Sequence, residues 1–427
     1  MTADATTLDA WLERIERLHS RPIDLTLDRV REVAHRLGLG TSGPTFIVGG
    51  TNGKGSTCAM LDAILRAAGY SVGLYTSPHL LAFNERAQID GVPATDAALI
   101  RQFEAVEAAR GTTTLTYFEF TTLAVLRLFQ GLAPDAMVLE IGLGGRLDAV
   151  NIVDADCSIL TSVDIDHTAY LGPTREAIGF EKAHIFRPGR PAICAEPMPP
   201  QSVLDVARDL DADLWLAGRD FSYSGDRQQW AYRGPTTRRA SLPYPALRGA
   251  NQLLNASGAL AALEALAELL PVSQQAVRQG LLAVEIPARF QVLPGRPTVV
   301  LDVAHNPHAA AVLAANLDSM GFFPRTHAVF GMLKDKDVSG VIARVGTRVD
   351  RWHVGPTPGG RGAEGAWLAA RIVEAGIKEQ DVVEHATLAE AYAAAKSEID
   401  VDDRIVVFGS FTTVAEVMRA RASNPDR

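Results

Sequence analysis

A glycine-rich turn between a strand and a helix constrains this chain more than any other feature. Residues 46–48 form an apolar run typical of a buried strand, and residues 58–68 repeat apolar side chains at helical spacing. The turn between them contains four glycines in seven residues, together with Lys54. Such a turn brings backbone N–H groups and a helix N-terminus close to one anion, and Lys54 can reach the outer phosphates of a nucleotide. The pattern predicts a phosphate-binding loop.

This loop departs from the common Walker pattern G-x-x-x-x-G-K-[ST] at two positions. Val48 occupies the place of the first glycine, and Gly55 occupies the place of the hydroxyl residue. The turn by itself therefore leaves two interpretations open: a nucleotide site, or a glycine-rich turn that binds no ligand.

Composition and charge limit the classes of function. The chain has 427 residues, enough for two or three domains, and its 47% hydrophobic and 21% charged residues are typical of a globular protein. A net charge of −9 and the lack of a basic run argue against a nucleic-acid partner. No apolar stretch approaches the about 18 residues of a membrane helix, and the first residues lack a signal-peptide pattern. We therefore expect a cytoplasmic protein without a membrane partner.

The cysteines are few and widely spaced. Cys58, Cys157 and Cys194 are an odd number with no close spacing. They predict neither a disulfide framework nor a cysteine-based zinc site.

Short apolar runs alternate with helical patterns along the chain. Strands are expected at residues 71–75, 137–139 and 158–160, and helices at residues 8–18, 27–37, 95–110, 118–129 and 251–270. This alternation predicts an α/β fold with a doubly wound, mostly parallel sheet. Residues 221–243 alternate aromatic and polar side chains instead, which suggests a small antiparallel excursion.

Proline and glycine mark the expected domain boundary. We predict an N-terminal domain over residues 1–287 and a linker over residues 288–297. A smaller C-terminal α/β domain would follow over residues 298–427, with strands near 298–301, 328–330, 351–353 and 405–407.

Polar side chains stand where the expected strands end, the place where parallel sheets bind ligands. Glu140 is followed by several glycines and could hold Mg²⁺ beside a triphosphate, but it could also cap a helix or be a solvated charge. His167 could be a metal ligand, a base or neither. Asn306 and Pro307 are typical of a helix start, which leaves Asp302 and His305 directed at a ligand.

The chain lacks a glycine-rich nucleophile elbow and a dinucleotide-binding fingerprint. Phosphoryl transfer to an acceptor is therefore the favoured class of chemistry. Residue patterns alone predict a two-domain enzyme that uses ATP.

Several motifs taken together resemble a known family. Residues 50–56, 75–80 and 139–148 are similar to motifs of the Mur ligase family, and within it to the folate branch. The resemblance extends over nearly the whole chain through residues 166–168, 181–183, 301–307 and 408–411. Residues 23–25 and 115–119 resemble the bacterial bifunctional form of that branch. In the folate branch Gly-Lys-Gly-Ser replaces the usual loop ending, so the departure from the Walker pattern is expected.

The resemblance implies a set of site residues. ATP would be bound by Thr51, Asn52, Gly53, Lys54, Gly55, Ser56, Asn255, Arg289, Asp302 and His305. Mg²⁺ would be held by Ser77, Glu140 and His167, and a carbamylated Lys182 would help hold a second Mg²⁺. The catalytic residues would be Lys54, His167 and Lys182. The pteridine would lie against Asp24, Leu25, Thr26, Thr116, Tyr117, Phe118, Glu119, Leu147, Asp148 and Ala149.

Two of these positions depend strongly on the resemblance. Thr26 stands where glycine is common in similar proteins, which leaves the fine shape of the pteridine pocket open. Without the resemblance, Lys182 would be interpreted as a helix-surface lysine paired with Glu181 or Glu176.

The implied activity is that of an ATP-dependent amide ligase with Mg²⁺ as cofactor. It would add L-glutamate to dihydropteroate and to reduced folates through an acyl phosphate. The two domains would close over this intermediate to exclude water. The resemblance also favours a monomer.

Three alternatives remain at this point. One is a monofunctional enzyme that acts on folates alone. Another is a P-loop kinase or NTPase that stops at phosphoryl transfer. The third is a nucleotide-binding regulatory module without turnover.

Overall fold

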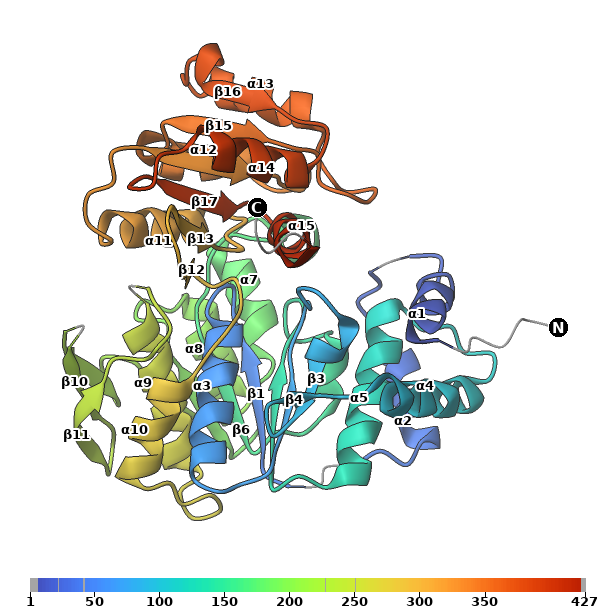
Figure 1. The fold of residues 1–427 in the computed structure, drawn as a ribbon. Helices are drawn as coiled ribbons and strands as arrows, with labels where there is room; N and C mark the ends of the chain where they lie inside the picture. Colours follow the sequence, from blue (N-terminus) through green and yellow to red (C-terminus); the bar gives the residue numbers. More distant parts are fainter. Residues whose placement is uncertain (1–6, 22, 41–42, 227, 250, 424–427) are drawn as a thin grey trace. The chain divides into compact units, whose positions relative to one another are not determined.

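The structure is a computed structural model that describes residues 7–21, 23–40, 43–226, 228–249 and 251–423. The chain divides into two compact units (Figure 1). The first comprises Met1–Ala246 with Leu253–Val284, and the second comprises Leu247–Gln252 with Glu285–Arg427.

An eight-stranded sheet forms the centre of the first unit, in the order β4-β3-β2-β5-β1-β6-β7-β8. The strands are β1 (Thr45–Gly49), β2 (Val72–Tyr75), β3 (Ala87–Ile89), β4 (Val92–Pro93), β5 (Ala136–Glu140), β6 (Cys157–Leu160), β7 (Pro191–Cys194) and β8 (Asp213–Leu216). All neighbours from β2 to β8 are parallel. Helices cover both faces of such a sheet, so its central strands are mostly apolar, and every residue of β1 and β5 is buried. The predicted doubly wound sheet is confirmed.

The helices of this part of the chain follow the predicted periodicity closely. They are α1 (Leu8–Glu16), α2 (Asp28–Arg36), α3 (Lys54–Ala67), α4 (Asp96–Arg110), α5 (Tyr117–Leu132), α6 (Thr168–Leu171), α7 (Arg175–Ala183), α8 (Gln201–Asp209), α9 (Gln252–Ala265) and α10 (Gln274–Ala283). The helix expected over residues 251–270 is shorter than predicted, because α9 ends at Ala265. A separate turn follows, in which Leu266 and Leu270 are still buried. Their burial explains why the apolar pattern continues past the helix end.

The edge of the sheet beyond β2 is antiparallel, which the sequence analysis missed. β3 and β4 form a hairpin in which Ile89 pairs with Val92. The two residues between them, Asp90 and Gly91, both have positive φ values, 55° and 77°. Asp-Gly between apolar residues is a strong signal for this tight turn, so the hairpin was predictable.

The predicted antiparallel excursion is a separate three-stranded sheet, in the order β11-β10-β9. Its strands are β9 (Ser222–Gly225), β10 (Gln229–Arg233) and β11 (Arg238–Pro243). Trp230 and Tyr232 are each 1% exposed, which accounts for the alternation of aromatic and polar residues.

The second unit is built on a six-stranded sheet in the order β12-β13-β17-β14-β15-β16, in which only β12 runs antiparallel to its neighbour among the described strands. The strands are β12 (Gln291–Leu293), β13 (Thr298–Leu301), β14 (Thr326–Phe330), β15 (Arg351–Val354), β16 (Val382–Glu384) and β17 (Arg404–Phe408). The helices are α11 (Pro307–Asp318), α12 (Val338–Val345), α13 (Gly365–Glu374), α14 (Leu388–Glu398) and α15 (Phe411–Ser423). β12 lies within residues 288–297, the segment predicted to be a linker.

The first helix of this unit begins as predicted. The Asn306 side chain accepts a hydrogen bond from the backbone N–H of Ala309 at 2.8 Å, and Pro307 is the first residue of α11.

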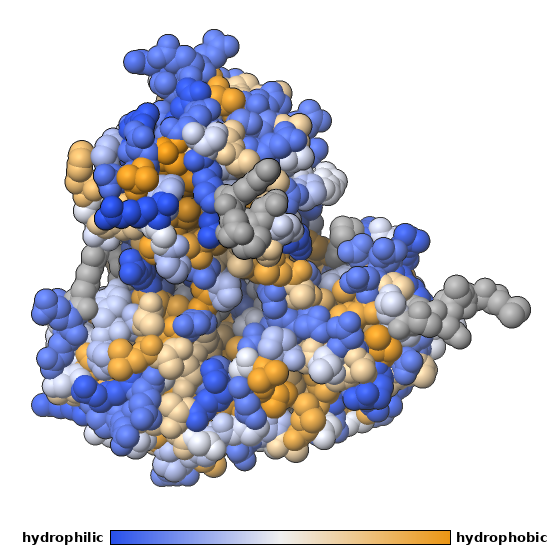
Figure 2. All heavy atoms as spheres, viewed as in Figure 1, coloured by the Kyte–Doolittle hydropathy of each residue, from blue (hydrophilic) through white to orange (hydrophobic). Residues whose placement is uncertain are grey.

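Within the described ranges, no helix combines the length and the apolar character needed to cross a membrane. Figure 2 shows hydrophilic side chains spread over the visible face, with hydrophobic side chains in separate patches between them.

A close contact between α3 and α10 gives a test of the first unit's packing. The two helices lie side by side (Figure 1), and a Cβ added at Gly280 would lie 2.5 Å from the Cα of Ile64. We expect Gly280→Ala to lower the free energy of unfolding by about 1–3 kcal/mol, because the backbones must separate. Urea denaturation measures this change.

The matched control is Gly131→Ala in α5, where an added Cβ meets nothing within 4 Å. This substitution should stabilise the helix by about 1 kcal/mol. Equal stability of the Gly280→Ala variant and the wild type would contradict the helix contact.

Candidate active site

The glycine-rich turn leads directly from β1 into α3 and has no space for larger residues. Gly50 and Gly53 have φ values of 143° and 88°, which favour glycine. A Cβ at Gly50 would lie 2.0 Å from the Thr161 hydroxyl, and a Cβ at Gly53 would lie 2.6 Å from the Asn255 amide oxygen. The structure thus places Asn255, expected at the nucleotide, directly beside the loop.

Two hydrogen bonds fix the loop against the residues that follow β6. The backbone N–H of Thr51 donates to the Ser162 carbonyl at 2.8 Å, and that of Asn52 donates to the Ser162 hydroxyl at 2.9 Å. α3 begins at Lys54, so Gly55 and Ser56 lie in its first turn, where free N–H groups and the helix dipole favour an anion.

Two lysine side chains converge on the carbonyl of Gly50. Lys54 Nζ donates to it at 3.1 Å and also to the Thr51 carbonyl at 3.3 Å, while Lys182 Nζ donates to it at 3.0 Å from α7. Lys182 is only 5% exposed. Burial and the nearby Lys54 charge lower the pKa of Lys182 to about 7. Much of this amine is therefore neutral at physiological pH.

The alternative of a helix-surface lysine at position 182 is wrong. The side chain is buried, and Glu181 forms its ion pair with Arg146 at 2.8 Å instead. Glu176 accepts hydrogen bonds from the backbone N–H groups of Gln201 and Ser202.

The residues expected at the metal lie where neighbouring parallel strands end. β2, β5, β1 and β6 are neighbours in the sheet in that order. Ser77 follows β2, Glu140 is the last residue of β5, the phosphate loop follows β1, and His167 follows β6. The Ser77 N–H donates to Glu140 Oε2 at 3.0 Å. Glu140 is 4% exposed and is therefore not a solvated charge at the rim.

His167 is the residue before α6 and has a left-handed backbone, with φ 53°. Its backbone N–H donates to Asp166 Oδ1 at 2.7 Å, and its Nε2 lies 3.9 Å from Asp166 Oδ2. A buried carboxylate, a serine and an imidazole at one sheet edge are a donor set that suits a divalent cation. The residues present therefore fit Mg²⁺.

A cavity of about 290 Å³ lies next to this edge. All ten residues expected at the pteridine line it, together with Ile23, Ser77, Pro78, Arg86, Gly142 and Leu143. A Cβ at Gly142 would lie 2.6 Å from the Phe118 ring, so glycine at this position leaves the aromatic wall in place.

Charged side chains lie in and beside the cavity. Arg29 joins two of its acidic residues, donating to Asp24 at 2.9 Å and to Glu119 at 3.1 Å. Glu119 also caps α5, accepting from the Thr116 N–H at 2.7 Å. Asp148 accepts from two backbone N–H groups, and burial raises the pKa of its carboxyl to about 6.

The Thr26 hydroxyl is buried at this cavity and has no hydrogen-bond partner among the residues that the structure describes. A glycine at this position would offer no such group. The departure noted in the sequence thus adds a hydrogen-bonding atom to the pocket.

Sequence reasoning missed two arginines of this site. Arg86 lines the cavity, donates to His79 Nδ1 at 2.9 Å and lies 5.5 Å from the Tyr117 ring centroid. Arg29 binds Glu119, which is 90 residues away in the chain. Neither arginine belongs to a motif with diagnostic spacing, so only the fold brings them to the pocket.

The second unit brings together its own three expected residues. Asp302 accepts from the N–H groups of Phe290 and Ala304, at 2.9 and 2.7 Å. Burial raises the pKa of Asp302 to about 6, although the Arg289 charge opposes the rise. Arg289 lies 5.5 Å and His305 6.1 Å from the ring of Phe411, which sequence reasoning had not assigned to the site.

The fold and this site define an ATP-dependent ligase built from Mur ligase domains. Residues 48–195 match the Mur ligase middle domain, and residues 288–411 match the Mur ligase, glutamate ligase domain. The chain is 44% identical to the dihydrofolate synthase/folylpolyglutamate synthase of Escherichia coli, over 97% of this chain and 95% of that protein. It belongs to the dihydrofolate synthase/folylpolyglutamate synthase branch of the Mur ligase family.

Solved structures agree with this assignment. E. coli FolC in complex with DHPP and ADP superposes with a TM-score of 0.94 at 43% identity, covering 99% of both chains. A bifunctional folylpolyglutamate synthase/dihydrofolate synthase with Mn, AMPPNP and L-glutamate bound gives a TM-score of 0.91 at 44% identity, covering 99% of this chain and 100% of that one.

The lowered pKa of Lys182 leads to a test of its chemical state. We expect the neutral amine to add CO₂ and release a proton, which gives a carbamate with two oxygen donors for Mg²⁺. Carbon-13 NMR of protein equilibrated with labelled bicarbonate should show one carbamate signal. Lys182→Ala should remove the signal and nearly all activity, and a short carboxylic acid should restore part of the activity.

The exposed Lys378→Ala variant is the matched control and should keep both the signal and the activity. If the wild-type protein showed no carbamate signal after equilibration with labelled bicarbonate, and Lys182→Ala kept near-normal activity, a carbamate at this position would be ruled out.

Proposed function

We propose that this protein adds L-glutamate to dihydropteroate, giving dihydrofolate, and to reduced folates, giving polyglutamates. The observation that carries the proposal is the position of Ser77. Ser77 lines the cavity assigned to the pteridine and also contacts Glu140 beside the phosphate loop. A substrate whose ring occupied the cavity could therefore extend its carboxylate toward the phosphates of ATP. The ligands named for the similar FolC structures, DHPP and ADP, support this assignment.

The chemistry requires activation of a carboxylate. A carboxylate resists attack by an amine, so its oxygen first accepts the γ-phosphoryl group of ATP, which yields an acyl phosphate and ADP. The glutamate amine then attacks the acyl carbon, inorganic phosphate leaves, and an amide remains. Bound Mg²⁺ would supply electrostatic stabilisation of the phosphoryl oxygens. Ser77, Glu140 and His167 would hold one ion, and carbamylated Lys182 would help hold a second.

The remaining site residues have proposed roles that match their surroundings. Lys54 stabilises the charge on the transferring phosphoryl group. Thr51, Asn52, Gly53, Gly55 and Ser56 bind the phosphates through the loop and the start of α3, with Asn255 beside Gly53. Arg289, Asp302 and His305 would contact ATP from the second unit.

The pteridine would lie between aromatic and acidic groups of the cavity. Tyr117 and Phe118 offer ring faces, while Asp148 and the Thr26 hydroxyl offer hydrogen-bonding atoms. Arg86 would contribute a further donor.

The protein would act as a monomer in the cytoplasm, where ATP and Mg²⁺ are available. Its domains would comprise residues 1–287 and 298–427, with a linker over residues 288–297. Size-exclusion chromatography with light scattering tests the oligomeric state.

The dual activity is tested by a coupled ADP-release assay. With ATP, Mg²⁺ and L-glutamate, we expect turnover of dihydropteroate and also of a reduced folate monoglutamate, because one cavity accepts both pteridines. Reactions without glutamate are the control and should release little ADP. Turnover of the folate alone would favour a monofunctional enzyme, and full ADP release without glutamate would favour a kinase or NTPase.

Lys54 is the second target of this assay. Lys54→Ala should lower kcat about 10²–10³-fold, equivalent to about 3–4 kcal/mol, because a preorganised charge at the transferring phosphoryl group is lost. Circular dichroism should show a retained fold. The Lys378→Ala variant again serves as the control, and wild-type turnover by a folded Lys54→Ala variant would contradict the assigned role.

A further inference from the structure

Two buried histidines and a glutamate converge in the second unit, on elements that carry none of the proposed ligase residues. His327 lies on β14, His353 on β15, and Glu398 is the last residue of α14. One ligand atom from each of the three lies within 4.8 Å of the others. His353 is 0% and His327 2% exposed, whereas the Glu398 side chain is 39% exposed. The cluster thus has a protected interior and one side open to solvent.

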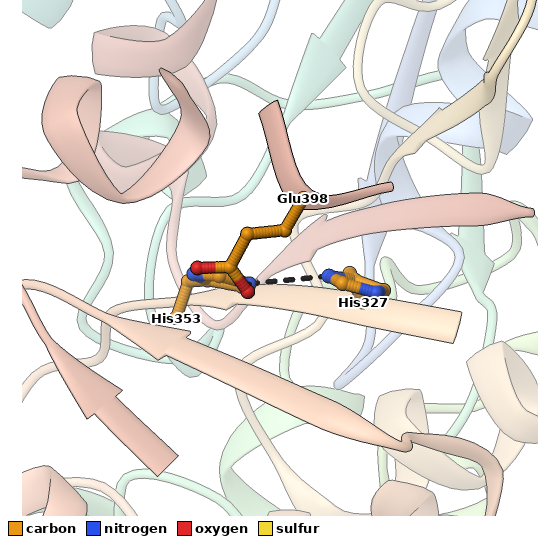
Figure 3. Close-up of side chains that lie close together, drawn as sticks. All are labelled: His327, His353 and Glu398. Carbon is orange, nitrogen blue, oxygen red and sulfur yellow. Dashed lines mark hydrogen bonds and ion pairs between the residues drawn. The ribbon is translucent and has the colours of Figure 1, made fainter. Parts of the chain in front are cut away.

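The distances suit a metal ion. His327 Nδ1 and His353 Nε2 are 3.2 Å apart, and His353 Nε2 is 3.9 Å from Glu398 Oε2. Figure 3 shows the Glu398 carboxylate beside the His353 nitrogen that faces His327. Two imidazole nitrogens bound to one tetrahedral zinc ion lie about 3.3 Å apart, given Zn–N bonds of about 2.0–2.1 Å. A small movement of the exposed carboxylate would complete a three-ligand set.

A third histidine orients the central ligand. His385 Nε2 lies 3.2 Å from His353 Nδ1, and the two rings are stacked with centroids 5.4 Å apart. When His353 Nδ1–H donates to His385, the Nε2 lone pair of His353 faces the centre of the cluster. Metal-bound histidines usually donate their other ring N–H to a partner in this way.

The charge state of the ligands also favours a cation. Burial lowers the pKa of His353 to about 4 and holds the pKa of His327 below its usual value, so both rings are neutral at physiological pH. Arg325 and Arg351 are positive charges near the cluster, and Arg351 donates to Glu398 Oε2 at 3.0 Å. The same oxygen lies 3.9 Å from His353 Nε2. A carboxylate oxygen has two lone-pair sites, so Oε2 can accept from Arg351 and still bind a cation, and Oε1 offers a second donor.

We propose that His327, His353 and Glu398 bind a Zn²⁺ ion, with His385 as a positioning residue and water in the fourth position. Two imidazoles and one carboxylate are ligands that suit zinc, whereas an Mg²⁺ site is built mainly from oxygen ligands. The ion would join β14, β15 and the end of α14. Residue spacing of 26 and 45 positions with no cysteine explains why the site has no sequence signature.

The test measures zinc binding to the full chain stripped of metal with EDTA. Excess Mg²⁺ is kept present to occupy the ligase site, and bound zinc is counted by equilibrium dialysis. We expect the wild type to bind one more equivalent of zinc than His327→Gln, and Glu398→Gln to bind that equivalent at least about tenfold more weakly. The exposed Glu379→Gln variant is the matched control and should bind as the wild type does.

Two further measurements separate a metal site from a purely structural cluster. Co²⁺ should give the visible absorption of a tetrahedral site in the wild type but not in His327→Gln, and His385→Gln should weaken binding about 10- to 100-fold. Zinc should also raise the Tm of the wild type more than that of Glu398→Gln. Equal zinc stoichiometry and affinity in the wild type and Glu398→Gln would overturn the proposal, and this exposed substitution decides the question even if His327→Gln fails to fold.

Discussion

The arrangement of the candidate active site depends on the backbone carbonyl of Gly50. It accepts hydrogen bonds from Lys54 at the start of α3 and from Lys182 on α7, so one backbone group ties two helices to the end of β1. This convergence requires glycine, because any Cβ at position 50 would collide with Thr161. It also places one lysine charge beside the other, which together with burial lowers the pKa of Lys182. The proposed phosphate site and the proposed modification of Lys182 therefore share one loop.

Strand order then determines which of the expected site residues lie together. β2, β5, β1 and β6 are neighbours, so residues from segments far apart in the chain arrive at one edge of the sheet. The contact between Ser77 and Glu140 extends this edge into the cavity lined by Phe118 and Asp148. The proposed activation of the substrate needs the acceptor carboxylate and the transferred phosphoryl group to be adjacent, and this order of strands is consistent with that requirement.

The second unit uses its parallel sheet in two different ways. Asp302 and His305 follow the end of β13, the common position for ligand-binding residues in such sheets. His327 and His353 instead lie within β14 and β15, where their rings are removed from water. A buried histidine pair needs either hydrogen-bond partners or a metal ion. Here His385 is a hydrogen-bond partner of His353, and Glu398 is the third member of the proposed metal site.

Local sequence patterns determined the phosphate loop, the alternation of strands and helices, and the cap of α11, because each depends on residues close together in the chain. The hairpin at Asp90 and Gly91 also depends on neighbouring residues, and the Asp-Gly turn signal in the sequence would have predicted it. The motifs that resemble the folate ligases located the ten residues found around one cavity. Tertiary structure alone decided the burial of Lys182, the bridge from Arg29 to Glu119 and the histidine cluster of the second unit. These features depend on contacts between residues that are tens of positions or more apart in the chain. The spacing of residues in a sequence does not predict which side chains a parallel sheet brings together.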